Sequence, residues 1–168
     1  MLNVKNIRSG PMHFFRLNIM KWLLSKNLKS GRILDAGSGD GSLSIQLAKK
    51  GFSIYAVEPS QEWHDIFKTR IKQTDIEKNI KIFHSLIEEI KFEINSFDAI
   101  VCGEVLEHIN NDEEALKYFH SLLKKGGTLI LSVPLMNKGW DASDEIGGHK
   151  RLYVFRELVS LLKASGFK

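Results

Sequence analysis

Short apolar runs alternate along the chain with stretches in which apolar residues recur at helical spacing. The runs are bounded by glycine, proline or polar residues, a pattern typical of strands buried on both faces of a parallel sheet. Because the runs are followed by helical stretches, the chain predicts right-handed βαβ units and an α/β fold with a doubly wound, mainly parallel sheet. The expected strands are residues 32–36, 52–58, 80–84, 97–103 and 127–134, and the expected helices are residues 12–27, 42–50, 61–73, 112–126 and 155–166.

The sequence also predicts where the fourth helix begins and ends and which face of the first helix is buried. Acidic residues 112–114 suit the positive end of the fourth helix, and the basic and glycine residues 124–126 are expected to form its last turn. In the first helix, the residues that share one stripe and are expected to face the core are Phe15, Ile19, Trp22 and Leu23.

Residues 33–41, ILDAGSGDG, place three glycines where the first strand gives way to its helix. Gly37 and Gly39 permit a positive φ and let a ligand approach the backbone, and Gly41 allows the helix to start against the sheet. Glu58 ends the second strand, where a carboxylate can accept both hydroxyls of a ribose. The pair indicates an adenosine-type ligand, and the alternative is a tight turn with an unrelated surface glutamate.

A nicotinamide cofactor fits this turn poorly. The dinucleotide fingerprint places its third glycine or alanine at position 42, where this chain has Ser42. Asp35 precedes the turn, where it can orient the loop or meet a cationic ligand. A nicotinamide-dependent oxidoreductase therefore stays as a less favoured alternative.

Three segments in order resemble class I S-adenosylmethionine-dependent methyltransferases, in the branch that includes the ubiquinone-biosynthesis O-methyltransferases. They are ILDAGSGDG with Glu58, FDAIVCGEVLEHI at 97–109 and KKGGTLILSVP at 124–134. The resemblance implies the Rossmann-like methyltransferase fold, S-adenosylmethionine as cofactor and S-adenosylhomocysteine as product. The cofactor contacts it implies are Asp35, Gly37, Ser38, Gly39 and Gly41 on the methionine and ribose side, Glu58 on the ribose hydroxyls, Pro59 and Ser60 beside the adenine, Gly103 and Glu104 beside the methionine, and Arg16 on the cofactor carboxylate.

The chain departs from the family pattern after the third strand. Where the family commonly has an aspartate that accepts from the adenine amino group, this chain has Leu86. The backbone at Leu86 and Ile87, or the side chain of Glu88, is expected to take over. For Arg16, the alternative is a solvated helix residue.

Two histidines are the candidate catalytic bases. A sulfonium-bound methyl is already activated, so no metal is required, and a base helps only by taking a proton from a hydroxyl acceptor. His108 follows the fourth strand and His149 lies in residues 140–153, which resemble a W…DE..GH.R.Y segment of some of these methyltransferases. The alternatives are a loop-stabilising role for His108 and a structured surface lid with internal salt bridges for 140–153.

The acceptor class is narrowed by what the sequence lacks. Enzymes that methylate amino groups of nucleic-acid bases typically have an Asn/Asp-Pro-Pro-aromatic run after the fourth strand, where this chain has GEVLEH. An RNA enzyme that methylates carbon through a cysteine nucleophile would need that cysteine in a substrate loop, whereas Cys102 lies in an apolar strand. The formal charge is only +4, with 24 basic residues scattered among 20 acidic ones, which disfavours a nucleic-acid partner. A small-molecule, lipid-linked or sugar hydroxyl is expected, and a non-catalytic cofactor-binding module is the alternative.

Length and composition predict one globular domain over residues 1–168. The resemblance implies that it is a methyltransferase domain, made of an N-terminal helical cap at 1–30, a cofactor-binding core at 31–135 and a substrate-side segment with the last helix at 136–168. A single cysteine, no signal peptide and no membrane-spanning run predict a cytoplasmic protein.

The sequence ends where a sixth strand of the family fold would begin, so strands 6 and 7 are expected to be missing. The fifth strand would then be an edge that invites self-association. A fragment of a longer enzyme is favoured over a natural short form.

Overall fold

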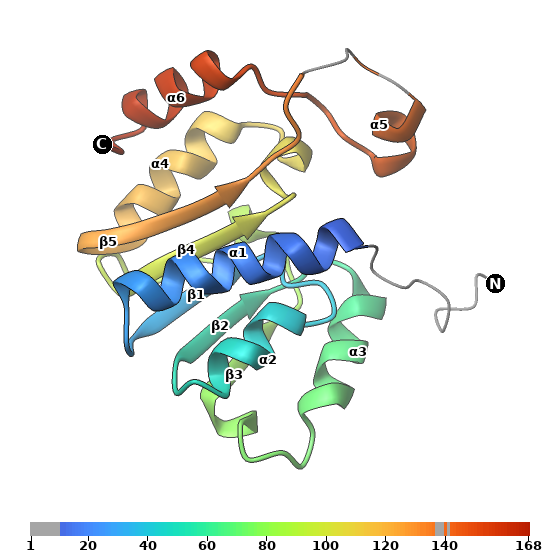
Figure 1. Ribbon diagram of the computed structural model, residues 1–168, viewed down its shortest axis with the longest axis vertical. Helices are drawn as coiled ribbons and strands as arrows, with labels where there is room; N and C mark the ends of the chain where they lie inside the picture. The colour runs from blue at the N-terminus through green and yellow to red at the C-terminus, as the bar shows by residue number, and fades with distance from the viewer. Residues whose placement is uncertain (1–10, 137–139, 141) are drawn as a thin grey trace.

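A parallel five-stranded sheet forms the centre of the computed structural model, which describes residues 11–136, 140 and 142–168 (Figure 1). The strand order is β3-β2-β1-β4-β5, and every neighbouring pair is parallel. The predicted doubly wound α/β fold is confirmed. The strands are β1 (Arg32–Ala36), β2 (Ser53–Val57), β3 (Ile80–Phe83), β4 (Phe97–Gly103) and β5 (Leu123–Ser132).

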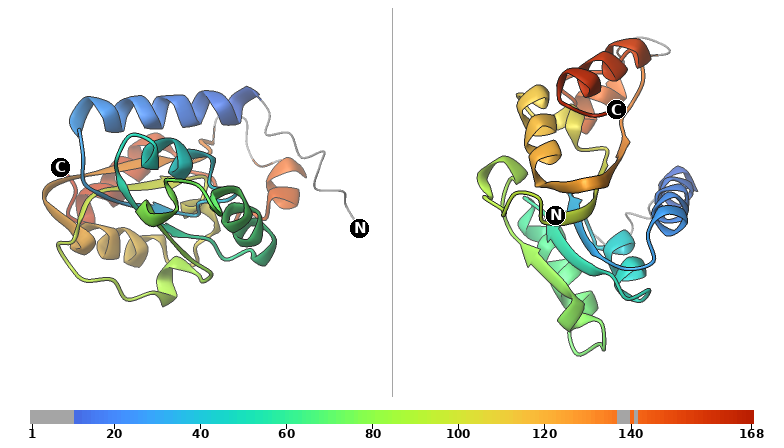
Figure 2. Two further views of the ribbon diagram at one scale, coloured as in Figure 1. Left: turned by 90° about the horizontal axis from the view of Figure 1, so that it is seen from below. Right: turned by 90° about the vertical axis from the view of Figure 1, so that its left-hand side faces the viewer.

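Helices cover both faces of this sheet and give three layers (Figure 2). Helices α1, α2 and α3 pack on one face, and α4 and α6 pack on the other. Among the described residues no helix combines the length and apolar character needed to cross a membrane. The helices are α1 (Pro11–Asn27), α2 (Ser42–Ala48), α3 (Gln61–Ile71), α4 (Asp112–Leu122), α5 (Ala142–Gly147) and α6 (Phe155–Ala164), with 3₁₀ turns at Glu77–Asn79, Ile87–Glu89 and Leu106–His108.

Strand β1 shows how the alternation of a strand feeds both layers. Ile33 belongs to the apolar cluster beneath α1 and α2, whereas Leu34 and Ala36 belong to the cluster beneath α4. Asp35 lies on the same side as Ile33, where Ser44 of α2 reaches it. The strand is buried over residues 33–36, which explains its continuous apolar pattern with one carboxylate as the exception.

Polar side chains cap the starts of two of the helices. Ser60 accepts a hydrogen bond from the Trp63 amide at the start of α3, and Asn111 accepts one from the Glu114 amide at the start of α4. The acidic residues in the first turn of α4 lie at its positive end. These caps fix where the loops after β2 and β4 finish.

The predicted buried stripe of α1 is wrong for three of its four residues, and only Leu23 packs against the core. Phe15 and Trp22 are 61% and 59% exposed and Ile19 is 41% exposed, while Leu17, Met20 and Leu24 face the core. The helix carries apolar residues on most of its circumference, so periodicity alone does not select a face. The buried face is selected by contacts with the rest of the protein. Met20 packs against Gly103 at the end of β4 so closely that a Cβ on residue 103 would lie 3.0 Å from its terminal methyl group.

The predicted end of α4 at residues 124–126 is also wrong. The helix ends at Leu122, and β5 begins at Leu123, which pairs with Phe97. Lys124 forms an ion pair with Asp98 at 2.8 Å, and Asp98 also accepts from the Arg32 amide. Pairing with the start of β4 therefore extends β5 back over residues 124–126, whose composition is typical of a helix end.

Strand β5 is an edge of the sheet, as predicted, because it pairs only with β4. Within the described part of the chain no strand follows it in the sheet, and the one later pairing is an isolated bridge between Leu135 and Tyr153. The absence of strands 6 and 7 from the sheet is thus confirmed for these residues.

We expect Gly41→Ala to destabilise the fold more than Gly126→Ala. Both glycines have a positive φ, 76° and 79°, but a Cβ at residue 41 would lie 2.2 Å from the Phe67 ring, whereas at residue 126 nothing lies within 4 Å. Backbone strain alone should lower the free energy of unfolding by about 1–2 kcal/mol, and overpacking should raise the loss at residue 41 to about 2–5 kcal/mol. Urea unfolding measures both, and equal losses would show that the Phe67 contact does not constrain the turn.

Candidate functional site

The glycine turn between β1 and α2 folds back toward β2. The amides of Gly37 and Ser38 both donate to the Val57 carbonyl, at 2.9 and 3.0 Å. Gly37 has a φ of 77°, and a Cβ there would lie 2.2 Å from a methyl group of Val105. The turn therefore requires glycine at this position both for its backbone conformation and for its close approach to the loop after β4.

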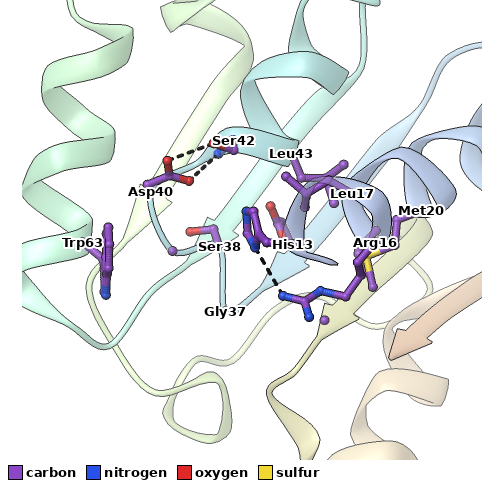
Figure 3. Close-up of a pocket in the computed structure, with 14 residues that line it drawn as sticks. His13, Arg16, Leu17, Met20, Gly37, Ser38, Asp40, Ser42, Leu43 and Trp63 are labelled. Carbon is purple, nitrogen blue, oxygen red and sulfur yellow. Dashed lines mark hydrogen bonds between the residues drawn. The ribbon is translucent and has the colours of Figure 1, made fainter. Parts of the chain in front are cut away.

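A cavity of about 240 Å³ opens beside this turn (Figure 3). It lies at the carboxyl ends of β1 and β4, where the strand order switches direction and ligands of doubly wound sheets bind. The turn forms one wall and α1 forms another. Its lining residues are His13, Arg16, Leu17, Met20, Asp35, Gly37, Ser38, Gly39, Asp40, Ser42, Leu43, Trp63, Val101 and Gly103.

Glu58 holds the turn in place from the end of β2. The carboxylate is 6% exposed, and it accepts from the Gly39 amide at 2.7 Å and from the Ser60 amide at 2.9 Å. A carboxylate offers about four acceptor positions, so two amides leave capacity for a ligand hydroxyl. Glu58 does not itself line the cavity, and its predicted contact with a ribose stays a prediction.

Asp35 is the buried charge of the cavity. The residue is 4% exposed, and the Ser44 hydroxyl donates to its Oδ2 at 2.6 Å. Burial raises the pKa of Asp35 to about 6 against the stabilising Ser44 bond, with smaller contributions from the charges of Glu58 and Asp40. A carboxylate in this state is suited to a cationic ligand, which would restore its ionised form.

Two buried polar atoms around the cavity lack a hydrogen-bond partner within the described residues. They are the Ser38 hydroxyl and Nε2 of His13. Unsatisfied buried polar groups are unfavourable in a folded protein, and a polar ligand in the cavity would satisfy them. The Ser38 hydroxyl and Nε2 of His13 are thus available to hydrogen-bond with a polar ligand, such as one with hydroxyl, amino and carboxylate groups.

Helix α1 brings Arg16 to the cavity, where it lies between two partners, and its predicted pairing with the cofactor carboxylate stays a prediction. Its guanidinium donates to Nδ1 of His13 at 3.3 Å (Figure 3). The guanidinium also lies 3.5 Å from the Glu104 carboxylate. Glu104 has a φ of 57°, a strained conformation for a non-glycine residue, and its carboxylate accepts from the Ser132 hydroxyl. The loop after β4 is therefore held in an unusual conformation beside the cavity.

The remaining predicted cofactor residues do not line this cavity. Ile87 is buried in the core and Leu86 is 47% exposed, while the Pro59 carbonyl accepts a hydrogen bond from His84. Their proposed places around an adenine stay predictions, as does that of Glu88. The predicted residues that lie outside the cavity lining are Gly41, Glu58, Pro59, Ser60, Leu86, Ile87 and Glu104.

Several residues that line the cavity were not predicted from the sequence. His13, Leu17 and Met20 share one face of α1 with spacings of four and three residues, which was a detectable helical signal masked by the apolar residues opposite. Trp63 reaches the cavity from the first turn of α3. The other missed residues are Asp40, Ser42, Leu43 and Val101.

A second group of ionisable residues joins the loop after β4 to residues 144–153. The two candidate bases lie together, because the rings of His108 and His149 are 5.1 Å apart between centroids. Nδ1 of His108 donates to the Gly148 carbonyl at 3.0 Å, and Nδ1 of His149 lies 2.9 Å from the Asp144 carboxylate. Glu107 is beside them with no exposed surface.

Further contacts fix this segment on the loop. The Lys150 amide donates to the Glu107 carbonyl at 2.9 Å. Arg151 pairs with Asp112 at 2.7 Å, and the Tyr153 hydroxyl donates to the same carboxylate at 2.9 Å. One contact is internal to the segment, because the Asp144 carboxylate lies 2.9 Å from Nδ1 of His149, but most of the anchoring contacts run to the β4–α4 loop.

The raised pKa of Asp35 predicts a pH-dependent cost to stability. Protonated Asp35 is favoured in the folded chain, so its contribution is neutral below the unfolded pKa of 3.8 and becomes unfavourable as the pH rises through about 6. We expect Asp35→Asn, which keeps an acceptor for Ser44, to gain roughly 2–3 kcal/mol relative to the wild-type chain between pH 4 and pH 7.5. Urea unfolding across this range tests it, and a constant difference between the two proteins would contradict it.

Comparison with known proteins identifies the family of the chain. A family model described as a methyltransferase domain matches residues 13–168. A ubiquinone biosynthesis O-methyltransferase of Coxiella burnetii is 32% identical over 123 residues, which are 73% of this chain and 52% of the relative. One of Xanthomonas campestris is 32% identical over 106 residues, 62% of this chain and 44% of the relative. The chain thus spans about half the length of the curated relatives it matches.

Solved structures share the fold at lower identity. Phosphoethanolamine N-methyltransferase 2 of Haemonchus contortus, in complex with S-adenosyl-L-methionine, has a TM-score of 0.82 and 22% identity over 96% of this chain and 38% of its own. The [4+2]-cyclase SpnF has a TM-score of 0.75 and 19% identity over 94% of this chain and 60% of its own. These likenesses establish the fold, which serves more than one reaction. With the family model matching 13–168, the chain belongs to the methyltransferase domain family.

Proposed function

We propose that this chain binds S-adenosylmethionine in the cavity beside the glycine turn and transfers its methyl group to a hydroxyl of a small-molecule, lipid-linked or sugar acceptor. The observation that carries the proposal is the cavity at the β1/β4 switch point, with a buried Asp35 and an unpartnered Ser38 hydroxyl on one wall and Arg16 on the other. The relatives named as O-methyltransferases support the hydroxyl as acceptor.

The lining residues match the charges of the cofactor. In the proposal, Arg16 pairs with the cofactor carboxylate, and Asp35 faces the positive charge of its ammonium and sulfonium groups. Glu58 accepts from the ribose hydroxyls while it keeps the turn folded through the Gly39 amide. Gly37, with no Cβ, allows the backbone to approach the ligand.

The reaction needs a positioned acceptor more than an additional catalyst. The bound cofactor supplies a methyl group already activated on a sulfonium. The acceptor oxygen forms a bond to that methyl carbon while the carbon–sulfur bond breaks, its electron pair stays on sulfur, and S-adenosylhomocysteine leaves. We assign the acceptor proton to Nε2 of His149 or His108, because both rings are oriented through Nδ1 by other groups. Alignment of the two reactants supplies most of the rate enhancement.

Two alternatives are separated from this proposal by binding and turnover. A nicotinamide-dependent oxidoreductase predicts calorimetric binding of NAD and none of S-adenosylhomocysteine, whereas our proposal predicts the reverse. A non-catalytic module predicts binding of S-adenosylhomocysteine without methyl transfer. Incubation with isotopically labelled S-adenosylmethionine and a panel of hydroxylated acceptors distinguishes that module from an enzyme.

We expect Glu58→Ala to weaken binding of S-adenosylhomocysteine by about 10- to 150-fold, because charge-assisted hydrogen bonds to the ribose and the bracing of the turn are both lost. Calorimetry measures the affinity. Glu93→Ala, which removes an exposed carboxylate from another loop, should leave the affinity unchanged. Unchanged affinity in the Glu58 variant would exclude this residue from the cofactor site.

We expect His149→Ala to lower turnover by about 100-fold or more while the affinity for S-adenosylhomocysteine stays within about twofold, since only a group serving the acceptor is removed. His120→Ala removes an exposed histidine that packs against Phe167 and serves as the control. A loss of cofactor affinity with normal turnover at saturation would place His149 in the cofactor site instead.

A further inference from the structure

Helix α1 has an exposed apolar stripe on the side that faces away from the sheet. Five of the twelve large apolar side chains that are exposed in the described part of the chain belong to this helix. Four of the five recur at spacings of three and four residues, so they share one face, opposite the buried Leu17, Met20 and Leu24. The apolar stripe consists of Met12, Phe15, Ile19 and Trp22, and Phe14 flanks it.

No other described element covers the apolar stripe. Helix α1 is the outermost element on its side of the molecule (Figure 2). Its inner face packs on the apolar cluster that it shares with α2 and the sheet, whereas its outer face has no protein partner among the described residues. Contiguous exposed apolar side chains of this kind mark an interaction site.

The apolar stripe lies in the most basic part of the chain. Residues 1–34 contain seven lysine and arginine residues and no aspartate or glutamate, whereas the other 134 residues contain 17 basic and 20 acidic residues. Helix α2, which lies beside α1, has no acidic residue either. The modest net charge of +4 therefore conceals a strong asymmetry, with positive charge concentrated in the region that includes α1.

Three lysine ammonium groups border the apolar stripe. Nζ of Lys26 lies 5.2 Å from the centre of the Trp22 ring. Lys50 reaches α1 from the turn after α2 and donates to the Ser25 hydroxyl at 2.7 Å, and Lys21 of α1 donates to a side chain of α2. None of the three forms an ion pair with a carboxylate in the described part of the chain. Their charge is thus available to an anionic partner.

We propose that the outer face of α1 docks on an anionic lipid surface, with the apolar stripe among the upper parts of the acyl chains and the lysines at the level of the phosphates. Helices that lie in this interface combine an apolar aromatic face with flanking lysines, and tryptophan is favoured at the boundary. Lysine can place its methylene groups on the apolar side while its ammonium reaches the headgroups. The docking does not depend on the proposed function.

Two other partners fit this surface less well. A second copy bound through the same face would place lysines against lysines, with no acidic residue of α1 to pair with them. A nucleic acid would attract the lysines but would not satisfy the whole stripe, because Met12 and Ile19 offer no ring on which a base can stack. An anionic lipid surface matches both the charge and the apolar stripe.

The test is vesicle binding by the full chain without an affinity tag. We expect cosedimentation to show at least about 10-fold tighter binding to phosphatidylcholine vesicles with about one third phosphatidylglycerol than to pure phosphatidylcholine, and salt should weaken the binding. Tryptophan emission should shift to shorter wavelength on the anionic vesicles. Trp22→Phe, which keeps an apolar ring, should bind with a smaller shift.

The apolar stripe is tested by a double variant. Phe15→Ser with Trp22→Ser should weaken binding to the anionic vesicles by about 100-fold or more, because two large apolar side chains no longer enter the lipid. Ile94→Ser with Phe155→Ser removes two apolar side chains that are exposed elsewhere and should bind like the wild-type chain. Urea unfolding should be unchanged in the α1 variant, since both of its side chains are exposed.

The lysines are tested in the same way. Lys26→Glu with Lys50→Glu should weaken binding to the anionic vesicles by about 30-fold or more. Arg156→Glu with Lys163→Glu makes the same change in net charge on α6 and should weaken it by no more than about threefold. The dependence of the wild-type chain on phosphatidylglycerol tests the proposal without any variant.

The proposal is overturned if the wild-type chain does not bind the anionic vesicles, or if the control variants lose as much binding as the α1 variants. Light scattering that shows self-association lost in Phe15→Ser with Trp22→Ser, without vesicle binding, would identify a second copy as the partner instead. Binding of a single-stranded oligonucleotide, without vesicle binding, would identify a nucleic acid. S-adenosylhomocysteine titrated into the same samples tests the proposed function separately, because vesicle binding does not require it.

Discussion

The carboxylate of Glu58 is the interaction on which the candidate cofactor site depends. Two loops end at it, one from β1 through the Gly39 amide and one from β2 through the Ser60 amide. Ser60 also caps α3, so the same carboxylate sets the start of that helix. The glycines make the turn possible, but their freedom favours no single conformation. Glu58 selects one, and this preorganises the turn before a ligand arrives.

Helix α1 forms a wall of the cavity because it packs on one face of the sheet and carries apolar residues on both its inner and its outer face. Its inner face supplies Leu17 and Met20 to the core and the cavity, while its outer face leaves Phe15 and Trp22 exposed. The helix is linked to α2 by the Lys21 ammonium, which donates to Gln46 at 2.7 Å, and to the loop after β4 by the pair between Arg16 and Glu104. A wall held by a few polar contacts over one apolar face can adjust more readily than the strands beneath it.

The fold was predictable from the sequence wherever local pattern and tertiary environment agree. The buried strands are continuous apolar runs, and the acidic residues 112–114 lie in the first turn of α4, as their charge favours. Prediction failed where long-range contacts determine which face of a helix is buried or where a strand begins. The inner face of α1 depends on Met20 meeting the end of β4, and residues after Leu122 become strand because Phe97 and Asp98 pair with them.

The same distinction separates the two parts of the site. Most residues predicted to contact the cofactor occur in one turn and at one strand end, so a local motif identifies them. The candidate acceptor side brings His108 and His149 together from distant segments, and the packing of residues 144–153 on the β4–α4 loop places both beside Glu107. A buried glutamate in GEVLEHI has no sequence signature that separates it from a solvated one. Its missing donors are visible only in three dimensions.

The loop after β4 connects these two parts through a few residues. Glu104, in its left-handed conformation, pairs with Arg16, which lines the cavity, whereas Glu107 and His108 lie beside His149. The 3₁₀ turn at Leu106–His108 fixes the relative direction of these carboxylates, because Leu106 is fully buried and its carbonyl accepts from the Ile109 amide. The two acidic side chains also repel each other, which contributes to the raised pKa of Glu107. A positive charge beside either carboxylate therefore lowers the electrostatic energy of this loop, as the Arg16 guanidinium does beside Glu104.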